Sequence, residues 1–133
     1  MLCADLVLET TNARTLVNCI NYRGGMNHHH VCLIVSCKSG TVLTFSSNIQ
    51  LPKRSIHAEE AAISRFRRMV CDGKVKRQDI RKGVRLVSLR VSPQGNLRMA
   101  RPCDRCSALI KKCGVVRYVE WSTNDGAIVG DMV

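Results

Sequence analysis

The chain has 133 residues and a formal net charge of +11, with 21 Lys and Arg against 10 Asp and Glu. Hydrophobic residues make up 45% of it, which excludes intrinsic disorder, and the length is typical of one domain over residues 1–133. No apolar run approaches the roughly 18 residues that cross a bilayer, and the start of the sequence lacks the pattern of a secretion signal. We therefore expect a soluble, intracellular protein, cytoplasmic or nuclear, with no membrane partner.

The first half of the chain predicts a helix, a hairpin and a second helix. Apolar residues recur at helical spacing over residues 1–21. The apolar segment 31–37 and the segment 41–45 predict two strands, joined by a tight turn at "KSG". Apolar residues at helical spacing then predict a helix that begins close to His57.

The second half predicts three strands and one more helix. Residues 84–91 alternate as a strand does, and a helix is expected to begin at Pro102 and end near Gly114. Residues 115–121 alternate again, and the tight-turn sequence "TNDG" leads into a last strand over residues 127–133. The order of elements predicts an α/β fold in which helices pack on a five-stranded mixed sheet, with the last two strands antiparallel.

The eight cysteines do not predict a disulfide framework. Such frameworks belong to secreted, core-poor chains, and several of these cysteines lie in apolar stretches where a reduced thiol behaves as a small hydrophobe. Only Cys103 and Cys106 have the two-residue spacing of a metal clip.

Two predicted helix starts bring together a set of metal-binding side chains. The helices that begin near His57 and Cys103 each follow a predicted strand, and such turns cluster at one edge of an α/β sheet. Cys106 lies one helical turn after Cys103. One imidazole and two thiolates leave the fourth position of a tetrahedral zinc open, which is typical of a catalytic site. Glu59 is placed to take a proton from a water at that position.

The two motifs "HAE" and "PCDRC" together resemble the H-x-E…P-C-x-x-C signature of the zinc-dependent cytidine deaminase-like superfamily. The order of predicted elements is similar to that of the family across nearly the whole chain. The resemblance implies a three-layer α/β/α fold and a single catalytic domain over residues 1–133. It also implies one zinc ion per chain as the cofactor, with the histidine and the two cysteines as ligands and the glutamate as the proton shuttle.

The implied activity is that of a hydrolytic deaminase. In this family zinc-bound hydroxide attacks C4 of cytosine, ammonia leaves, and uracil is the product. The resemblance places the backbone N–H of Ala58 against the substrate ring and Asn48 against the sugar. Arg101 and Arg105 flank the cysteines in sequence and are candidates for binding a substrate phosphate.

Other chemically suggestive residues have simpler interpretations. Glu60 is expected to be an acid in the first turn of its helix, favoured there by the helix dipole. The histidines at 28–30 have no spaced partners and are expected to face solvent. Cys113 and Trp121 are expected to belong to the core, although Trp121 also suits base stacking.

The charge distribution favours a phosphate-bearing cytosine substrate, either a nucleotide or a single-stranded nucleic acid. Between residues 53 and 112 lie 17 of the 21 basic residues but only five acids. An aromatic content of 4% weakens the nucleic-acid case, because few side chains can stack on bases.

Several alternatives stay open at this point. The short "TNDG" turn resembles free cytidine deaminases, whereas the histidine of "HAE" differs from the cysteine that those enzymes usually have. A free cytidine or deoxycytidine deaminase, an adenosine deaminase acting on RNA, and a non-catalytic nucleic-acid-binding module on the same fold all fit. A structural zinc domain would need a fourth ligand such as Cys71 or Cys113. Because many small relatives are dimers or tetramers, a homo-oligomer is also compatible with the resemblance.

Overall fold

The computed structural model describes residues 29–133, except for the side chain of His29. The helix predicted over residues 1–21 lies outside this range. Within it, neither helix is long and apolar enough to cross a membrane.

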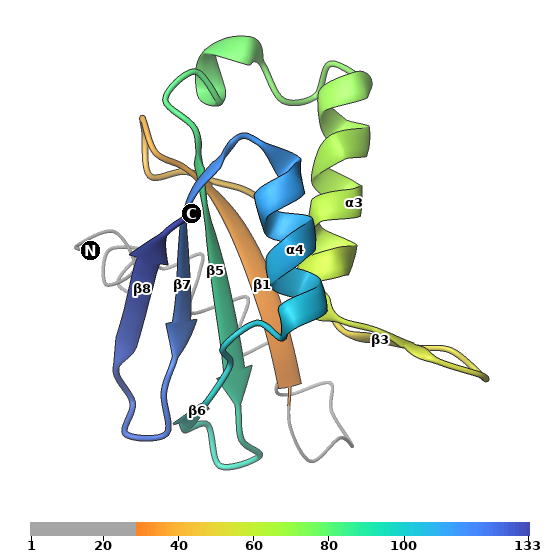
Figure 1. Cartoon of the computed structure of the whole chain (residues 1–133), viewed down its shortest axis with the longest axis vertical. Coiled ribbons are helices and arrows are strands. Elements are labelled where there is room, and N and C mark those ends of the chain that lie inside the picture. Colours follow the sequence, from red (N-terminus) through yellow and green to blue (C-terminus); the bar gives the residue numbers. More distant parts are fainter. Residues whose placement is uncertain (1–28) are drawn as a thin grey trace.

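A mixed sheet forms the body of the molecule (Figure 1). Its strands run in the order β2-β1-β5-β7-β8, and the short β6 pairs with β5 outside this path. Strands β5 and β7 are parallel, while the other pairs, including the last two strands, are antiparallel. The elements in chain order are β1 His29–Ser36, β2 Val42–Ser47, β3 Ile49–Gln50, β4 Ser55–Ile56, α3 Ala58–Cys71, the 3-10 helix η1 Arg77–Asp79, β5 Val84–Val91, β6 Leu97–Arg98, α4 Asp104–Cys113, β7 Val116–Ser122 and β8 Ile128–Met132.

The prediction of a mixed α/β sheet is confirmed, with one addition. The antiparallel β1–β2 hairpin and the antiparallel pairing of the last two strands are present as expected. The sheet has six strands rather than five, because the two-residue β6 pairs with the C-terminal end of the central strand β5. Two residues are too few to produce a periodic pattern, so the sequence gives no signal for it.

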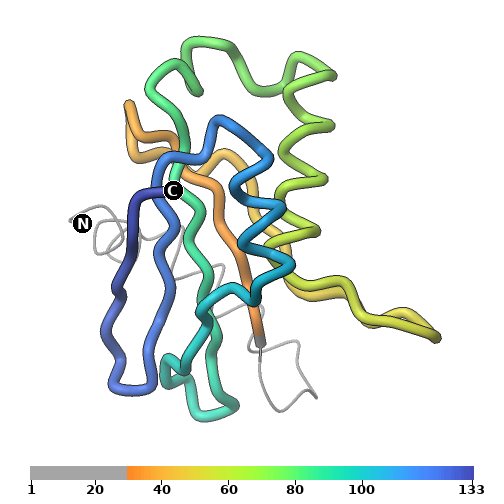
Figure 2. The backbone as a smooth tube through the Cα atoms, in the orientation of Figure 1, coloured from red at the N-terminus to blue at the C-terminus, as the bar shows by residue number. Residues whose placement is uncertain are grey.

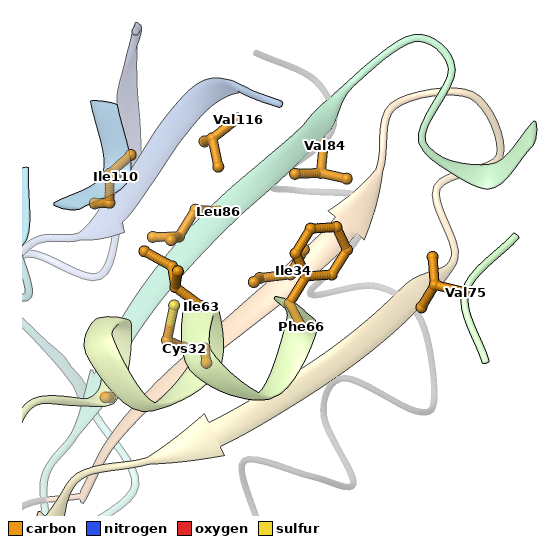
Figure 3. Close-up of a cluster of buried hydrophobic side chains, with 11 residues drawn as sticks. Cys32, Ile34, Ile63, Phe66, Val75, Val84, Leu86, Ile110 and Val116 are labelled. Carbon is orange, nitrogen blue, oxygen red and sulfur yellow. The ribbon is translucent and has the colours of Figure 1, made fainter. Parts of the chain in front are cut away.

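Both described helices pack on the same face of the sheet, over one apolar cluster (Figures 1 and 3). On β1, Cys32 and Ile34 point to this face, because side chains alternate along a strand. Phe66 of α3 and Ile110 of α4 belong to the same cluster and are almost fully buried. Residues 29–133 therefore form two layers, the sheet and one layer of helices, and the third layer of the expected fold stays a prediction.

The opposite face of the sheet is also shielded from solvent. Val31 and Leu33 on β1, and Val87 and Leu89 on β5, form a second cluster in which each is at most 1% exposed. Strands β1 and β5 are thus buried on both faces, which explains the continuous apolar run over residues 31–35 of β1.

A two-stranded arm, residues 49–56, projects from the body before α3 (Figure 2). Strands β3 and β4 pair through Ile49 with Ile56 and Gln50 with Ser55. The Leu51 N–H donates to the Arg54 carbonyl oxygen at 2.8 Å and closes the turn. The arm was not predicted, because its strands are as short as β6.

The two helices begin at the same end of the sheet (Figure 1). Helix α3 has His57 as its N-cap, and α4 has Cys103 as its N-cap, so the helix expected to begin at Pro102 begins at Asp104. Cys103 has extended backbone angles, which leave Pro102 buried outside the helix. The predicted end of α4 is confirmed, since Gly114 follows its last residue with φ +79°.

Truncating the core side chain Leu86 to alanine is expected to lower the free energy of unfolding by about 2–5 kcal/mol, because it leaves a cavity in the helix-facing cluster. Chemical denaturation of the zinc-free protein measures this. Met132→Ala is the control, since Met132 is 77% exposed and its truncation should cost less than about 0.5 kcal/mol. Equal effects of the two substitutions would contradict the assignment of the core.

Candidate functional site

Three potential metal ligands converge where the two helices begin. His57 Nδ1 lies 3.6 Å from Cys103 Sγ and 3.3 Å from Cys106 Sγ, although 46 positions separate His57 from Cys103. All three ligand atoms lie within 4.8 Å of one another. The meeting of these side chains follows from the parallel course of α3 and α4, whose N-caps lie side by side.

The spacing of these atoms fits a tetrahedral zinc. Typical Zn–S and Zn–N bond lengths and tetrahedral angles place a ligand nitrogen and sulfur roughly 3.5 Å apart, close to both separations in the structure. Among the described residues no fourth ligand joins the group. Cys71 and Cys113 lie at the C-terminal ends of their helices, away from it. Within residues 29–133, the arrangement therefore leaves one tetrahedral position without a protein ligand.

Burial distinguishes the two thiols. Cys106 is 1% exposed and Cys103 is exposed. Desolvation, together with the nearby Glu59 carboxylate, raises the pKa of the Cys106 thiol to about 12. A metal that binds here at neutral pH consequently displaces a proton, so its affinity increases with pH.

Glu59 lies in the first turn of α3 with its carboxylate turned into the protein. The residue is 1% exposed, and burial raises the pKa of the carboxyl group. Within residues 29–133, its Oε1 atom makes no hydrogen bond. The Nε2 atom of His30 lies 3.4 Å from this oxygen. An acceptor without a hydrogen bond in a buried position is available to a water or a substrate group.

The expectation that the histidine run faces solvent is wrong for His30. Its side chain is 15% exposed, and its Nε2 lies 2.7 Å from Ser88 Oγ on β5. Burial lowers the pKa of His30 to about 4, assisted by the charges of Arg90 and His57, so the ring is neutral at physiological pH. The alternation along β1 was the available signal, because it places His30 on the same face as Cys32 and Ile34.

A cavity of about 290 Å³ opens beside the metal ligands. The structure brings Asn48 and Arg101, both candidates from the sequence, into its wall together with His57, Glu59 and Cys103. Sequence reasoning missed three further lining residues from three different segments: His30, Ser55 and Arg90.

No protein-family model matches the chain, and no curated protein matches it. The interpretation of the site therefore depends on its own geometry.

Two other candidate residues lie outside the cavity wall. Ala58, the first residue of α3, is fully buried and packs in the helix-facing cluster. Arg105 forms an ion pair with Glu60, with Nη2 3.0 Å from both carboxylate oxygens. Glu60 is a first-turn acid of α3, as expected, and this pair directs Arg105 away from the cavity.

Trp121 orients Arg101. The guanidinium carbon of Arg101 lies 5.6 Å from the centre of the half-buried indole ring, within the range of a cation–π contact. Among the described residues, Trp121 joins neither apolar cluster, contrary to the prediction that it belongs to the core. Cys113 is half-buried against the helix-facing cluster, in agreement with its predicted core role.

Proposed function

We propose that this chain is a zinc-dependent hydrolytic deaminase of the cytidine deaminase-like superfamily, which converts cytosine to uracil in a phosphate-bearing substrate. One observation carries the proposal: in the part of the chain that the structure describes, an imidazole and two thiols converge on a metal position with one open site, and a buried carboxylate lies beside it. This combination serves hydrolysis, whereas a structural zinc site has four protein ligands.

A zinc ion held by His57, Cys103 and Cys106 supplies, when bound, Lewis acidity that brings the pKa of water toward neutrality. The reaction consumes one water and releases ammonia, so protons must move from the water to the ring and to the leaving amine. Glu59 is the residue for this task, because burial raises the pKa of its carboxyl group and so makes the group a better proton acceptor than an exposed glutamate.

His30, which contacts Ser88 on β5, packs beside the Glu59 carboxylate. One nitrogen of the neutral His30 ring, Nε2, lies 2.7 Å from the Ser88 hydroxyl and 3.4 Å from the Glu59 carboxylate. A ring packed in this way restricts the rotamers of Glu59 without adding a charge that would lower the pKa of the carboxyl group. We assign His30 as a positioning residue for the proton shuttle.

Two arginines favour a substrate that carries phosphate. Arg90 and Arg101 both line the cavity, and Asn48 offers an amide for a sugar hydroxyl. A free nucleoside gives guanidinium groups no anionic partner, whereas a phosphate accepts charge-assisted hydrogen bonds from them.

A substrate panel tests the proposal. The zinc-loaded protein is incubated with cytidine, deoxycytidine, their monophosphates, single-stranded DNA, RNA and the adenosine counterparts. The mass of each base and the release of ammonia are then measured. We expect conversion of cytosine in the phosphate-bearing compounds. Turnover of adenine compounds alone would contradict the choice of base, and salt-sensitive nucleic-acid binding without any converted base would favour the non-catalytic module.

His30→Ala is expected to lower kcat by about 10–100-fold while the zinc content stays at the wild-type level, because the change loosens Glu59 and leaves the ligands in place. Metal analysis and steady-state kinetics of the same preparation measure the two quantities. His30→Gln restores a hydrogen-bonding group and should recover part of the rate. Loss of zinc in His30→Ala would show that His30 supports the metal rather than the shuttle.

A further inference from the structure

An open groove of about 830 Å³ lies between the arm and α3, next to the cavity. Four exposed basic residues line it: Arg54 of the arm, Arg65 and Arg68 of α3, and Lys74 after the helix. The two acids in its wall are Glu60 and Asp72, and Arg105 already neutralises Glu60. The groove therefore carries a net positive charge.

The basic side chains of the groove are available to an external anion. In the part of the chain that the structure describes, no carboxylate lies within ion-pair distance of Arg54, Arg65, Arg68 or Lys74. The Arg65 guanidinium lies 5.8 Å from the centre of the Phe45 ring, a contact that holds it at the groove without neutralising it.

The groove and the cavity share a wall. Along the end of the arm, Arg54 and Ile56 line the groove, whereas Ser55 and His57 line the cavity. This partition follows from the alternation of side chains along an extended segment. A ligand with one base in the cavity can therefore continue past the arm into the groove.

We propose that this groove binds the sugar-phosphate backbone of a single-stranded polynucleotide whose target cytosine enters the cavity. The inference depends on the proposed function and narrows its substrate from any phosphate-bearing compound to a polymer. The groove has nearly three times the volume of the cavity, so it accommodates more than one nucleotide unit. A second copy of the chain is a poor occupant, because it would bring a net charge of +11 to a basic surface.

The chemistry of the groove also predicts how the polymer is recognised. Among the residues lining it there is no aromatic ring, so bases have no stacking platform there. Arginine and lysine contact phosphates, which are the same in every sequence. Binding in the groove is consequently independent of base sequence and sensitive to salt.

The test compares two double variants that remove the same charge. Arg65→Gln with Arg68→Gln alters the groove, and Arg67→Gln with Arg77→Gln removes two exposed arginines outside it. Each zinc-loaded protein, in a Glu59→Gln background, binds a fluorescent single-stranded DNA or RNA of about 15 nucleotides at several salt concentrations. Matching thermal denaturation curves ensure that both variants are folded.

For the groove variant we expect affinity to fall by about tenfold or more, and the slope of log K against log salt to shrink by about 1.4, which is 0.7 for each lost phosphate contact. With Glu59 restored, kcat/KM for the oligonucleotide should fall similarly, whereas turnover of deoxycytidine monophosphate should stay at the wild-type level. The groove assignment would be overturned if both double variants lost the same amount of affinity for the oligonucleotide. It would also be overturned if KM were equal for the oligonucleotide and the monophosphate. Groove-dependent binding without conversion of any base would instead overturn the deaminase proposal alone.

Discussion

Zinc-loaded Glu59→Gln is expected to keep its metal and to lose turnover, with kcat lower by about 10²–10⁴-fold. The substitution preserves size and shape at a position that is 1% exposed, so the fold should be unaffected. It removes the group that can gain and release a proton beside the open metal position. Metal analysis and kinetics on the best substrate of the panel give the two readouts.

Glu60→Gln is the matched control for this experiment. Glu60 is the next residue in the same helical turn, but its carboxylate pairs with Arg105 outside the cavity. We expect this variant to keep wild-type kcat. If Glu59→Gln retained zinc and turned over normally, the assignment of the proton shuttle would be wrong.

Cys106→Ser is expected to abolish stoichiometric zinc binding and the stabilisation that zinc provides. Cys106 is the buried thiol of the ligand set, and a neutral hydroxyl does not replace a thiolate as a zinc ligand. Zinc at 100 times its dissociation constant stabilises a folded protein by about 2.7 kcal/mol. The wild-type melting temperature should therefore rise on zinc addition, while that of the variant should not change.

Cys113→Ser controls for the loss of a thiol from the same helix. Cys113 lies at the C-terminal end of α4, away from the metal ligands. Its substitution should therefore leave the zinc-dependent rise in melting temperature intact. A normal zinc response in Cys106→Ser would remove Cys106 from the ligand set and, with it, the basis for the proposed chemistry.

The strands and helices with long apolar patterns could be predicted from sequence, because burial on one or both faces leaves a periodic signal. Strands β1 and β5 and helix α3 belong to this group. The arm and β6 could not be predicted, since two-residue strands depend on tertiary pairing rather than on local pattern. The start of α4 differed by two residues, which is within the usual uncertainty of a helix boundary.

The metal ligands were predictable for a different reason: motif spacing and two helix starts specify them together. The rest of the cavity was not. Arg101 and Arg105 flank the same cysteines in sequence, and only the packing of α4 beside α3 decides that Arg105 meets Glu60 instead of lining the cavity. His30 was missed because its role depends on Ser88, 58 residues later on a neighbouring strand.

The cavity is built from two kinds of structure. His30 and Arg90 face each other across the ladder between β1 and β5, so the interior of the sheet fixes them. Asn48, Ser55 and Arg101 come from segments outside that ladder, at the arm and before α4. Laboratory evolution could therefore retune substrate choice through these peripheral positions, while His30 and Arg90 keep the places that the paired backbone gives them.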